Sequence, residues 1–373
     1  MIIKDEIHGT MEFDCLEGRI IDTATFQRLR RIKQMSITNL VYPGANHTRF
    51  EHSLGTAHLS ALIARKLGLG DNEVRKVKLY GLLHDIGHAA FSHEGEDVLK
   101  RYVGTHEETG KKRIVTGEIA DILSENYKPS EIADVGESAH GGIITSDLGA
   151  DRMDYLERDA RNTGVAYGMI DSDRIVHTLI MKRGQLCIEE GGLEAAEYLL
   201  VARFMMFSAV YMHRTVRIAT AMLYRAIEGA IADRSVTPQE FMELDDESAM
   251  VAMVRSKTGG KYANALLNRR LYKEVCSFPK EGWDEKKAEA LETSLSGKFG
   301  CDIVVDYPHQ FFKPAEIKVD TRDGLKPITG LSGLVESLKT AEENRMRVLV
   351  LADKETKEKH GDKIKSSAQT KRH

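Results

Sequence analysis

The chain has 373 residues, of which 42% are hydrophobic and 29% charged, with a formal net charge of −4. This composition is typical of a globular protein with one large core and a smaller lobe, and the charge excludes a general electrostatic attraction to nucleic acid or membranes. The four cysteines form no Cys-x-x-Cys pair, which argues against a zinc knuckle or a disulfide framework. Because the sequence shows neither a signal-peptide pattern nor an apolar segment long enough to span a bilayer, we expect a cytoplasmic protein.

A small hairpin and a basic helix are the first predicted elements. Short alternating runs around Gly9 predict the hairpin within residues 1–15. Asp22 or Thr23 can cap a helix that extends to Gln34, because apolar residues recur at helical spacing behind them. The other face of this helix is strongly basic.

Two buried helices are expected to carry a histidine and a His-Asp dipeptide. Apolar residues at intervals of four predict a helix over 49–67, which places His52 in its first turn. A second helix starts near Asp71 and ends at His84 and Asp85.

A third helix, within residues 147–161, has polar residues where a core face is expected. Asp151, Asp154, Tyr155 and Arg158 stand at helical spacing on one side of it. Imidazole nitrogens and carboxylate oxygens together suit a borderline divalent ion such as iron, manganese, nickel or zinc. The hypothesis is therefore a metal site around the His-Asp dipeptide. The alternative is a set of hydrogen-bonded core histidines beside solvated acids.

The rest of the chain predicts a mainly α protein with a small C-terminal α+β lobe. An alternating run over 177–189 predicts a β-hairpin, and residues 194–232 predict a long helical stretch whose basic residues lie among apolar ones. This arrangement suits a wall that faces phosphate, but stems packed on a core with their heads in water would look alike. The predicted organisation is a core over 1–235, a lobe over 236–353 and a disordered polar tail over 354–373.

Several short motifs, in order along the chain, resemble the HD-domain phosphohydrolases. The closest likeness is to the deoxynucleoside triphosphate (dNTP) triphosphohydrolases that combine a SAM and an HD domain, although the SAM domain has no counterpart in these residues. The motifs are Asp5-Glu-Ile-His-Gly, Ile21-Asp-Thr, Phe26-Gln-Arg-Leu-Arg-Arg-Ile-Lys-Gln, Pro43-Gly-Ala, Arg49-Phe-Glu-His-Ser-Leu-Gly, Leu83-His-Asp-Ile-Gly-His, Phe91-Ser-His, Thr105-His-Glu and Asp151-Arg-Met-Asp-Tyr. They cover most of residues 1–230.

The resemblance implies a helical HD core, a metal centre and an activity. The implied metal ligands are His52, His84, Asp85 and Asp151. The ion is iron, manganese, magnesium, nickel or zinc. The implied reaction is hydrolysis of a dNTP to a deoxynucleoside and inorganic triphosphate.

The resemblance also implies catalytic and substrate-binding residues. His93 is the candidate acid for the leaving 5′-oxygen and Glu96 its orienting partner, where the family has aspartate. His88 and His106 are expected to contact phosphates. Further expected substrate contacts are Arg49, Arg152 and Arg203 on the triphosphate and Tyr155 and Tyr211 under the deoxyribose.

A second nucleotide site between subunits is a further implication. It would bind GTP or dGTP as an activator and order a homo-oligomer, a dimer or a tetramer. Asp22, Gln27 and Arg30 match base-reading residues, and Arg269 and Lys273 match distal phosphate contacts.

Two alternatives stay open from the sequence. One is another HD hydrolase, such as a nucleoside monophosphatase or a phosphodiesterase. The other is a catalytically silent nucleotide sensor or nucleic-acid scaffold, against which the complete ligand set and the lack of a basic excess weigh.

Overall fold

The computed structural model describes residues 1–308 and 316–370 and divides into two compact units. Among the described residues, the first unit comprises 1–206, 236–251 and 316–336, and the second comprises 207–235, 252–308 and 337–370. The chain therefore passes between the units several times, whereas the predicted organisation was a simple succession of core and lobe. The prediction of a mainly helical fold is confirmed.

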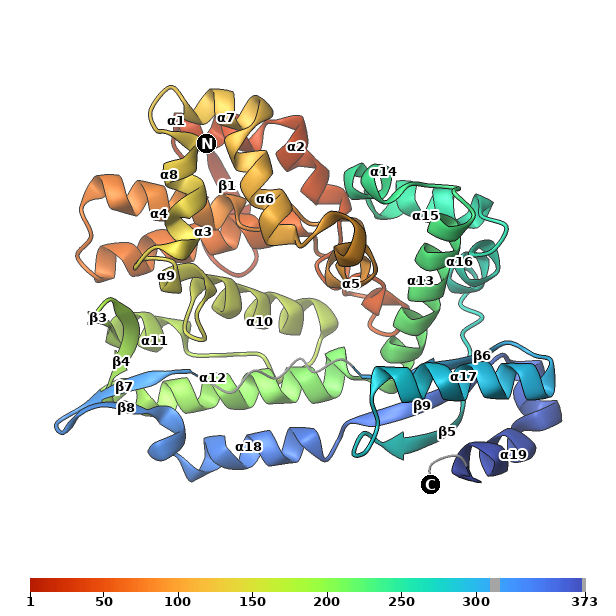
Figure 1. Ribbon diagram of the computed structural model, residues 1–373. Helices are drawn as coiled ribbons and strands as arrows, with labels where there is room; N and C mark the ends of the chain where they lie inside the picture. Colours follow the sequence, from red (N-terminus) through yellow and green to blue (C-terminus); the bar gives the residue numbers. More distant parts are fainter. Residues whose placement is uncertain (309–315, 371–373) are drawn as a thin grey trace. The chain divides into compact units, whose positions relative to one another are not determined.

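The first unit consists mostly of helices (Figure 1). They are α1 (Cys15–Ile21), α2 (Ala24–Gln27), α3 (Arg49–Lys66), α4 (Asp71–Leu83), α5 (Ser92–Val103), α6 (His106–Val115), α7 (Gly117–Leu123), α8 (Pro129–Ala133), α9 (Gly142–Thr145), α10 (Ala150–Thr163), α11 (Ser172–Thr178), α12 (Leu193–Met206) and α14 (Pro238–Glu243). Helix α15 (Asp246–Arg255) also begins here.

Helix α3 is central to the arrangement because it packs against both α4 and α10 (Figure 1). It begins where Glu51 accepts a hydrogen bond from the backbone N–H of Thr48 at 2.7 Å, which satisfies a free donor at the helix start. Beside it, α1, α2, α4, α6, α7 and α8 contribute apolar side chains to one buried core, in which Phe26, Leu54 and Leu82 are almost completely covered. This core fixes the two helices that carry His52 and His84.

Two small sheets complete the first unit. Strands β1 (Ile2–Asp5) and β2 (Gly9–Glu12) form the predicted N-terminal hairpin. Strands β3 (Leu179–Lys182) and β4 (Gln185–Glu189) form the second predicted hairpin, with Arg183 and Gly184 both at positive φ as its tight turn requires. Two later strands extend this sheet in the order β3-β4-β7-β8. They are β7 (Lys318–Thr321), parallel to β4, and β8 (Gly324–Pro327).

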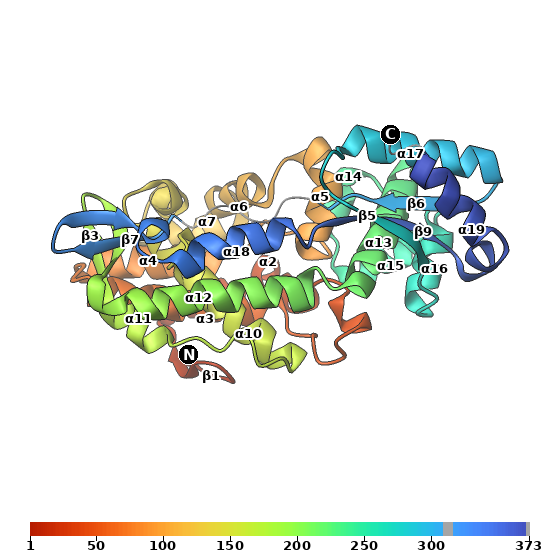
Figure 2. The same ribbon diagram turned by 90° about the horizontal axis from the view of Figure 1, so that it is seen from below.

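The second unit has a three-stranded antiparallel sheet of order β5-β9-β6 (Figure 2). The strands are β5 (Lys273–Pro279), β6 (Ile303–Asp306) and β9 (Arg347–Ala352), and the helices are α13 (Arg214–Ala232), α16 (Gly260–Leu267), α17 (Glu285–Phe299) and α19 (Lys354–Thr370). Helix α18 (Gly333–Glu343) runs from residues of the first unit into residues of the second. Residues of α17 and α19 close the apolar core of this sheet.

The prediction of a disordered tail from residue 354 is wrong for the described residues. Residues 354–370 form α19, which buries Thr356, Ile364 and Ala368 against the β5-β9-β6 sheet and α17. Its apolar stripe is too sparse to be recognised in a strongly charged segment, so only the tertiary contacts reveal it. Residues 371–373 of the predicted tail lie outside the described residues.

The predicted helix from Asp22 to Gln34 is also shorter than expected. Thr23 caps α2, which ends at Gln27, and a 3-10 turn over Arg28–Arg31 follows. Arg28 is buried and donates to the backbone carbonyls of His88 and Leu244. These distant contacts favour the tighter turn.

The long helical stretch predicted over 194–232 is interrupted by a π-helical turn, Phe207–Tyr211. No single described helix is long and apolar enough to cross a membrane. Of the described helices, only the bent pair formed by residues 190–211 and 214–232 reaches the length and hydropathy of a membrane span, by length and composition alone.

Candidate metal and phosphate site

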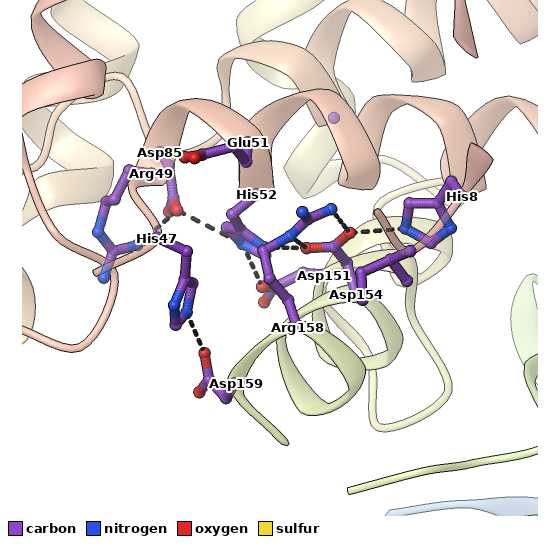
Figure 3. A network of polar contacts seen from close by, with 12 residues as sticks. His8, His47, Arg49, Glu51, His52, Asp85, Asp151, Asp154, Arg158 and Asp159 are labelled. Carbon is purple, nitrogen blue, oxygen red and sulfur yellow. Dashed lines mark hydrogen bonds and ion pairs between the residues drawn. The ribbon is translucent and has the colours of Figure 1, made fainter. Parts of the chain in front are cut away.

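The four predicted metal ligands come together at the meeting point of α3, α4 and α10. His52 lies in the first turn of α3, His84 caps the end of α4 with Asp85 next to it, and Asp151 lies in the first turn of α10. Nε2 of His52 lies 3.1 Å from Oδ1 of Asp151 and 3.5 Å from Oδ2 of Asp85 (Figure 3). Nε2 of His84 lies 3.4 Å from Oδ1 of Asp85 and 3.8 Å from Oδ1 of Asp151. We call these four residues the ligand cluster.

Both histidines of the ligand cluster turn their Nε2 atoms toward the carboxylates. Nδ1 of His52 is 2.7 Å from Oδ2 of Asp154, and Nδ1 of His84 is 2.8 Å from the carbonyl oxygen of Gly81. Both Nε2 atoms are buried, and among the described residues neither has a partner with hydrogen-bond geometry. Buried polar atoms are rarely left unpaired, so these residues fit a bound divalent ion.

The charges around the ligand cluster also favour a cation. Burial alone would lower the pKa of His52, but the carboxylates of Asp151 and Asp154, one beside each ring nitrogen, raise that pKa to about 10. Burial opposes ionisation of Asp85, yet the charge of Arg49 beside it holds the pKa of this carboxyl well below its usual range. The carboxylates of Asp85 and Asp151 are therefore ionised and favour a cation between them.

A second group, His88, His93, Glu96 and His106, adjoins the ligand cluster; we call it the stacked cluster. Nε2 of His88 is 3.3 Å from Oδ1 of Asp85, which links the two clusters. Both oxygens of Glu96 are 2.9 Å from Nδ1 of His106, and one is 3.3 Å from Nδ1 of His93. Glu96 is thus hydrogen-bonded to both His93 and His106, and not to His93 alone.

The rings of the stacked cluster are poorly arranged to share a metal ion. The four side chains come close enough together to hold a cation. However, the rings of His88 and His106 stack almost parallel, with their centroids 3.9 Å apart. Because an ion lies near the plane of any imidazole that binds it, two such rings are poorly arranged to share one ion. Burial and the charge of Arg49 keep the pKa of His88 low, whereas Glu96 raises that of His106 against the effect of burial.

The turn that carries His93 has an unusual backbone. Phe91 and Ser92 have φ values of 64° and 56°, in the left-handed region that few residues other than glycine adopt. Asp246 holds this turn, because its carboxylate accepts from the backbone N–H groups of Phe91 at 2.7 Å and of Lys33 at 2.9 Å. The hydroxyl of Ser92 accepts from Nε of Arg49 at 2.8 Å. The strained turn is thereby tied to the ligand cluster.

Two predicted phosphate-binding arginines share one acidic partner. Asp147 pairs with Nη1 of Arg152 and lies 3.8 Å from Nη1 of Arg203. Tyr155 stands three residues after Arg152 on α10. Arg49 pairs with Asp85 while its other terminal nitrogen, Nη2, is buried without a hydrogen-bond partner among the described residues.

The remaining predicted residues are only partly brought together. In the first unit, Gln27 accepts from Nε of Arg30 at 2.8 Å, and Asp22 is exposed nearby at the end of α1. Tyr211, Arg269 and Lys273 belong to the second unit. Their roles stay predictions.

Sequence reasoning missed the carboxylates that support the site. They are Asp147 beside the two arginines, Asp154 behind His52, and Asp246 under the strained turn. For Asp154 the signal was present, since it lies on the polar face of the third predicted helix. The contacts of Asp147 with Arg203 and of Asp246 with Phe91 join residues far apart in the sequence, so no local pattern indicated them.

Comparisons with known proteins agree with this geometry. The family described as HD domain matches residues 49–165, and the family described as HD associated region matches residues 170–372. This chain belongs to the HD-domain family. The HD match contains all four residues of the ligand cluster and all four of the stacked cluster.

Relatives of this HD-domain chain cover most of its length. An uncharacterized protein of Methanocaldococcus jannaschii is 38% identical, over 95% of this chain and 79% of the relative. The chain resembles the structure of a phosphohydrolase from Bacteroides thetaiotaomicron with a TM-score of 0.77 at 27% identity, over 95% of this chain and all of that one. A deoxynucleoside triphosphate triphosphohydrolase SAMHD1 homolog of Dictyostelium discoideum is 29% identical over 82% of this chain and 66% of that protein. The chain is thus placed among the HD-domain phosphohydrolases, which are metal-dependent.

Proposed function

We propose that this HD-domain protein is a metal-dependent dNTP triphosphohydrolase, which converts a dNTP and water to a deoxynucleoside and inorganic triphosphate. The observation that carries the proposal is the junction of the two clusters at Asp85, 3.3 Å from His88. A cation and several phosphate-directed donors would then act on neighbouring atoms of one substrate. The names of relatives that act on dNTPs support this choice within the family.

The ligand cluster would hold the ion through His52, His84, Asp85 and Asp151. A divalent ion bound there supplies Lewis-acid activation of the attacking water and of a phosphoryl group. Arg49 keeps Asp85 ionised, so that the carboxylate is ready as a ligand without first losing a proton.

Binding of a triphosphate would use the positive groups around this centre. Nη2 of Arg49 and the ring nitrogens of His88 are buried without hydrogen-bond partners in the described part of the chain. Phosphate oxygens would accept from Nη2 of Arg49 and from the single N–H of the neutral His88 ring. Arg152 and Arg203 face Asp147, and a substrate would compete with this carboxylate for them. Tyr155, beside Arg152, would pack against the deoxyribose and disfavour a 2′-hydroxyl there. Tyr211 is proposed as a second sugar contact on the family resemblance alone.

His93 would supply the proton that the leaving group needs. Its side chain is 59% exposed, and Nδ1 is directed to Glu96, which leaves Nε2 available. As water attacks the α-phosphorus, the bond from phosphorus to the 5′-oxygen breaks and this oxygen takes the proton from Nε2. His106, held by the same Glu96, would bind phosphate as a cation.

A guanine nucleotide is proposed as activator, at a site between subunits of a homo-oligomer. Asp22, Gln27 and Arg30 would read the base, and Arg269 and Lys273 would meet the phosphates. The contact of Gln27 with Arg30 supports a shared role.

Product analysis tests the proposal. The protein is incubated with each dNTP and NTP under iron, manganese, magnesium and nickel, with and without GTP or dGTP. Deoxynucleoside plus triphosphate is the expected outcome, with ribonucleotides unreacted. Release of single orthophosphate would identify a monophosphatase instead, and binding of single-stranded nucleic acid without any turnover would favour a silent scaffold.

A further inference from the structure

Asp154 is a buried carboxylate whose two oxygens make four hydrogen bonds with three residues. Oδ2 lies 2.7 Å from Nδ1 of His52 and 2.9 Å from Nε of Arg158. Oδ1 lies 2.7 Å from Nε2 of His8 and 2.8 Å from Nη2 of Arg158 (Figure 3). Its side chain is fully covered, and it contacts Nδ1 of His52 and not the Nε2 atom that faces the rest of the ligand cluster.

We propose that Asp154 is the positioning residue of the metal centre, which fixes the tautomer and ring orientation of His52. When the carboxylate accepts a hydrogen bond from Nδ1–H, the ring keeps its proton on Nδ1 and the lone pair of Nε2 is left for the ion. A neutral imidazole with its proton on Nε2 could not coordinate through that atom. The inference rests on the ligand cluster of the proposed function and not on the identity of the substrate.

The surroundings of Asp154 prevent it from turning away. Arg158 holds it through two nitrogens and is itself anchored to Asp5, with Nη1 2.8 Å from Oδ2. Arg158 is only 1% exposed, so water competes little for these bonds. Each oxygen of Asp154 already has two partners, and rotation would leave buried donors unpaired.

Helix α3 is shaped to admit this carboxylate. Gly55 lies one turn after His52, and a Cβ at this position would come within 1.8 Å of Oδ1 of Asp154 and 2.6 Å of Nη2 of Arg158. Gly55 has an ordinary helical backbone, so conformational freedom does not explain the glycine. The space beside His52 is therefore occupied by the acid that orients it.

The other histidine ligand is oriented by a backbone carbonyl, that of Gly81, which no substitution removes. Only the His52 side of the centre can be tested by changing a side chain. Helix α10 also offers a matched control, because Asp159 lies 2.7 Å from Nε2 of His47, is equally buried, and touches none of the ligand cluster.

The experiment measures the affinity for Mn²⁺ by chelator competition, without substrate, in wild type, Asp154→Asn and Asp159→Asn. An asparagine amide can donate to Nδ1 and so favour the unsuitable tautomer of His52. We expect Asp154→Asn to lose about 10- to 100-fold in affinity and Asp159→Asn to stay within about twofold of wild type. Unchanged affinity in Asp154→Asn, or equal losses in both variants, overturns the proposal.

Two further measurements keep the test decisive if Asp154→Asn does not fold. Gly55→Ala displaces the carboxylate without removing a polar group, and it should also weaken Mn²⁺ binding by about tenfold or more. In zinc-loaded wild type, ring ¹⁵N spectra should show His52 bound through Nε2 with a proton on Nδ1. Coordination through Nδ1 would overturn the proposal. None of these outcomes depends on which nucleotide is hydrolysed, so a wrong substrate assignment would leave them intact.

Discussion

The ligand cluster and the stacked cluster are built from the same residue types but differ in what occupies their ring nitrogens. In the ligand cluster, each Nδ1 is tied to a fixed acceptor and each Nε2 faces a carboxylate without a hydrogen bond. In the stacked cluster, Glu96 is hydrogen-bonded to Nδ1 of His106, and the rings of His88 and His106 stack on one another. On the proposed assignment, the difference teaches that the direction of the lone pairs, and not the count of histidines and acids, distinguishes the metal site from the phosphate site.

The most severe test of this comparison removes a member of the ligand cluster. Asp151→Ala takes away an oxygen 3.1 Å from Nε2 of His52, so metal and activity should be lost together. We expect metal affinity to fall by more than the roughly 100-fold that an outer-shell change costs. Metal content by elemental analysis and dNTP turnover check this.

Asp121→Ala, which removes an exposed aspartate on α7, is the control and should keep both properties. Full metal occupancy in Asp151→Ala would remove Asp151 from the ligand cluster.

A change in the stacked cluster should separate metal from chemistry. His93→Ala removes the proposed acid but no member of the ligand cluster, so the metal should remain while turnover falls by about 10²- to 10⁴-fold. Metal analysis and kcat measured on the same preparation check this.

The control is His177→Ala on α11, which removes another exposed histidine and should leave turnover unchanged. If His93→Ala turned over at the normal rate, the proton would have to come from elsewhere.

The smallest expected effect concerns Asp246, which supports the turn before His93. Burial raises its pKa from 3.8 to about 6 despite two backbone N–H donors. A raised pKa means that its stabilising contribution is complete below about pH 4 and is lost as the pH rises through about 6. A rise of this size corresponds to about 3 kcal/mol in the free energy of unfolding.

Urea unfolding of wild type and Asp246→Asn between pH 4 and 7 checks this, since the variant should lack that decline. Asp245→Asn is the matched control, because the pKa of Asp245 is lowered where that of Asp246 is raised, and its contribution to stability therefore changes with pH in the opposite direction. Burial opposes ionisation of Asp245, but Arg31 lowers its pKa, so its contribution is lost as the pH falls. Equal pH profiles for wild type and Asp246→Asn would contradict the assignment.

The helices that carry the site could be predicted because their signals are local. Apolar periodicity located α3 and α4, polar residues at helical spacing located α10, and the motifs within these helices supplied the predicted ligand cluster. The positive φ values of Phe91 and Ser92 could not be predicted, because neither residue prefers them and Asp246, far along the chain, holds the turn. Likewise Arg28 shortens its helix through carbonyls of His88 and Leu244, and α19 exists only through its buried face.

The pairing of β7 with β4 has a practical consequence for anyone who divides this chain. Strand β4 lies between β3 and β7, and β7 is supplied by residues 318–321, well beyond the predicted border at 235. A fragment ending at that border would keep the β3-β4 hairpin but leave the row of N–H and C=O groups along β4 open. Open edges of this kind recruit strands from other molecules, so such a fragment is expected to aggregate even with every catalytic residue present.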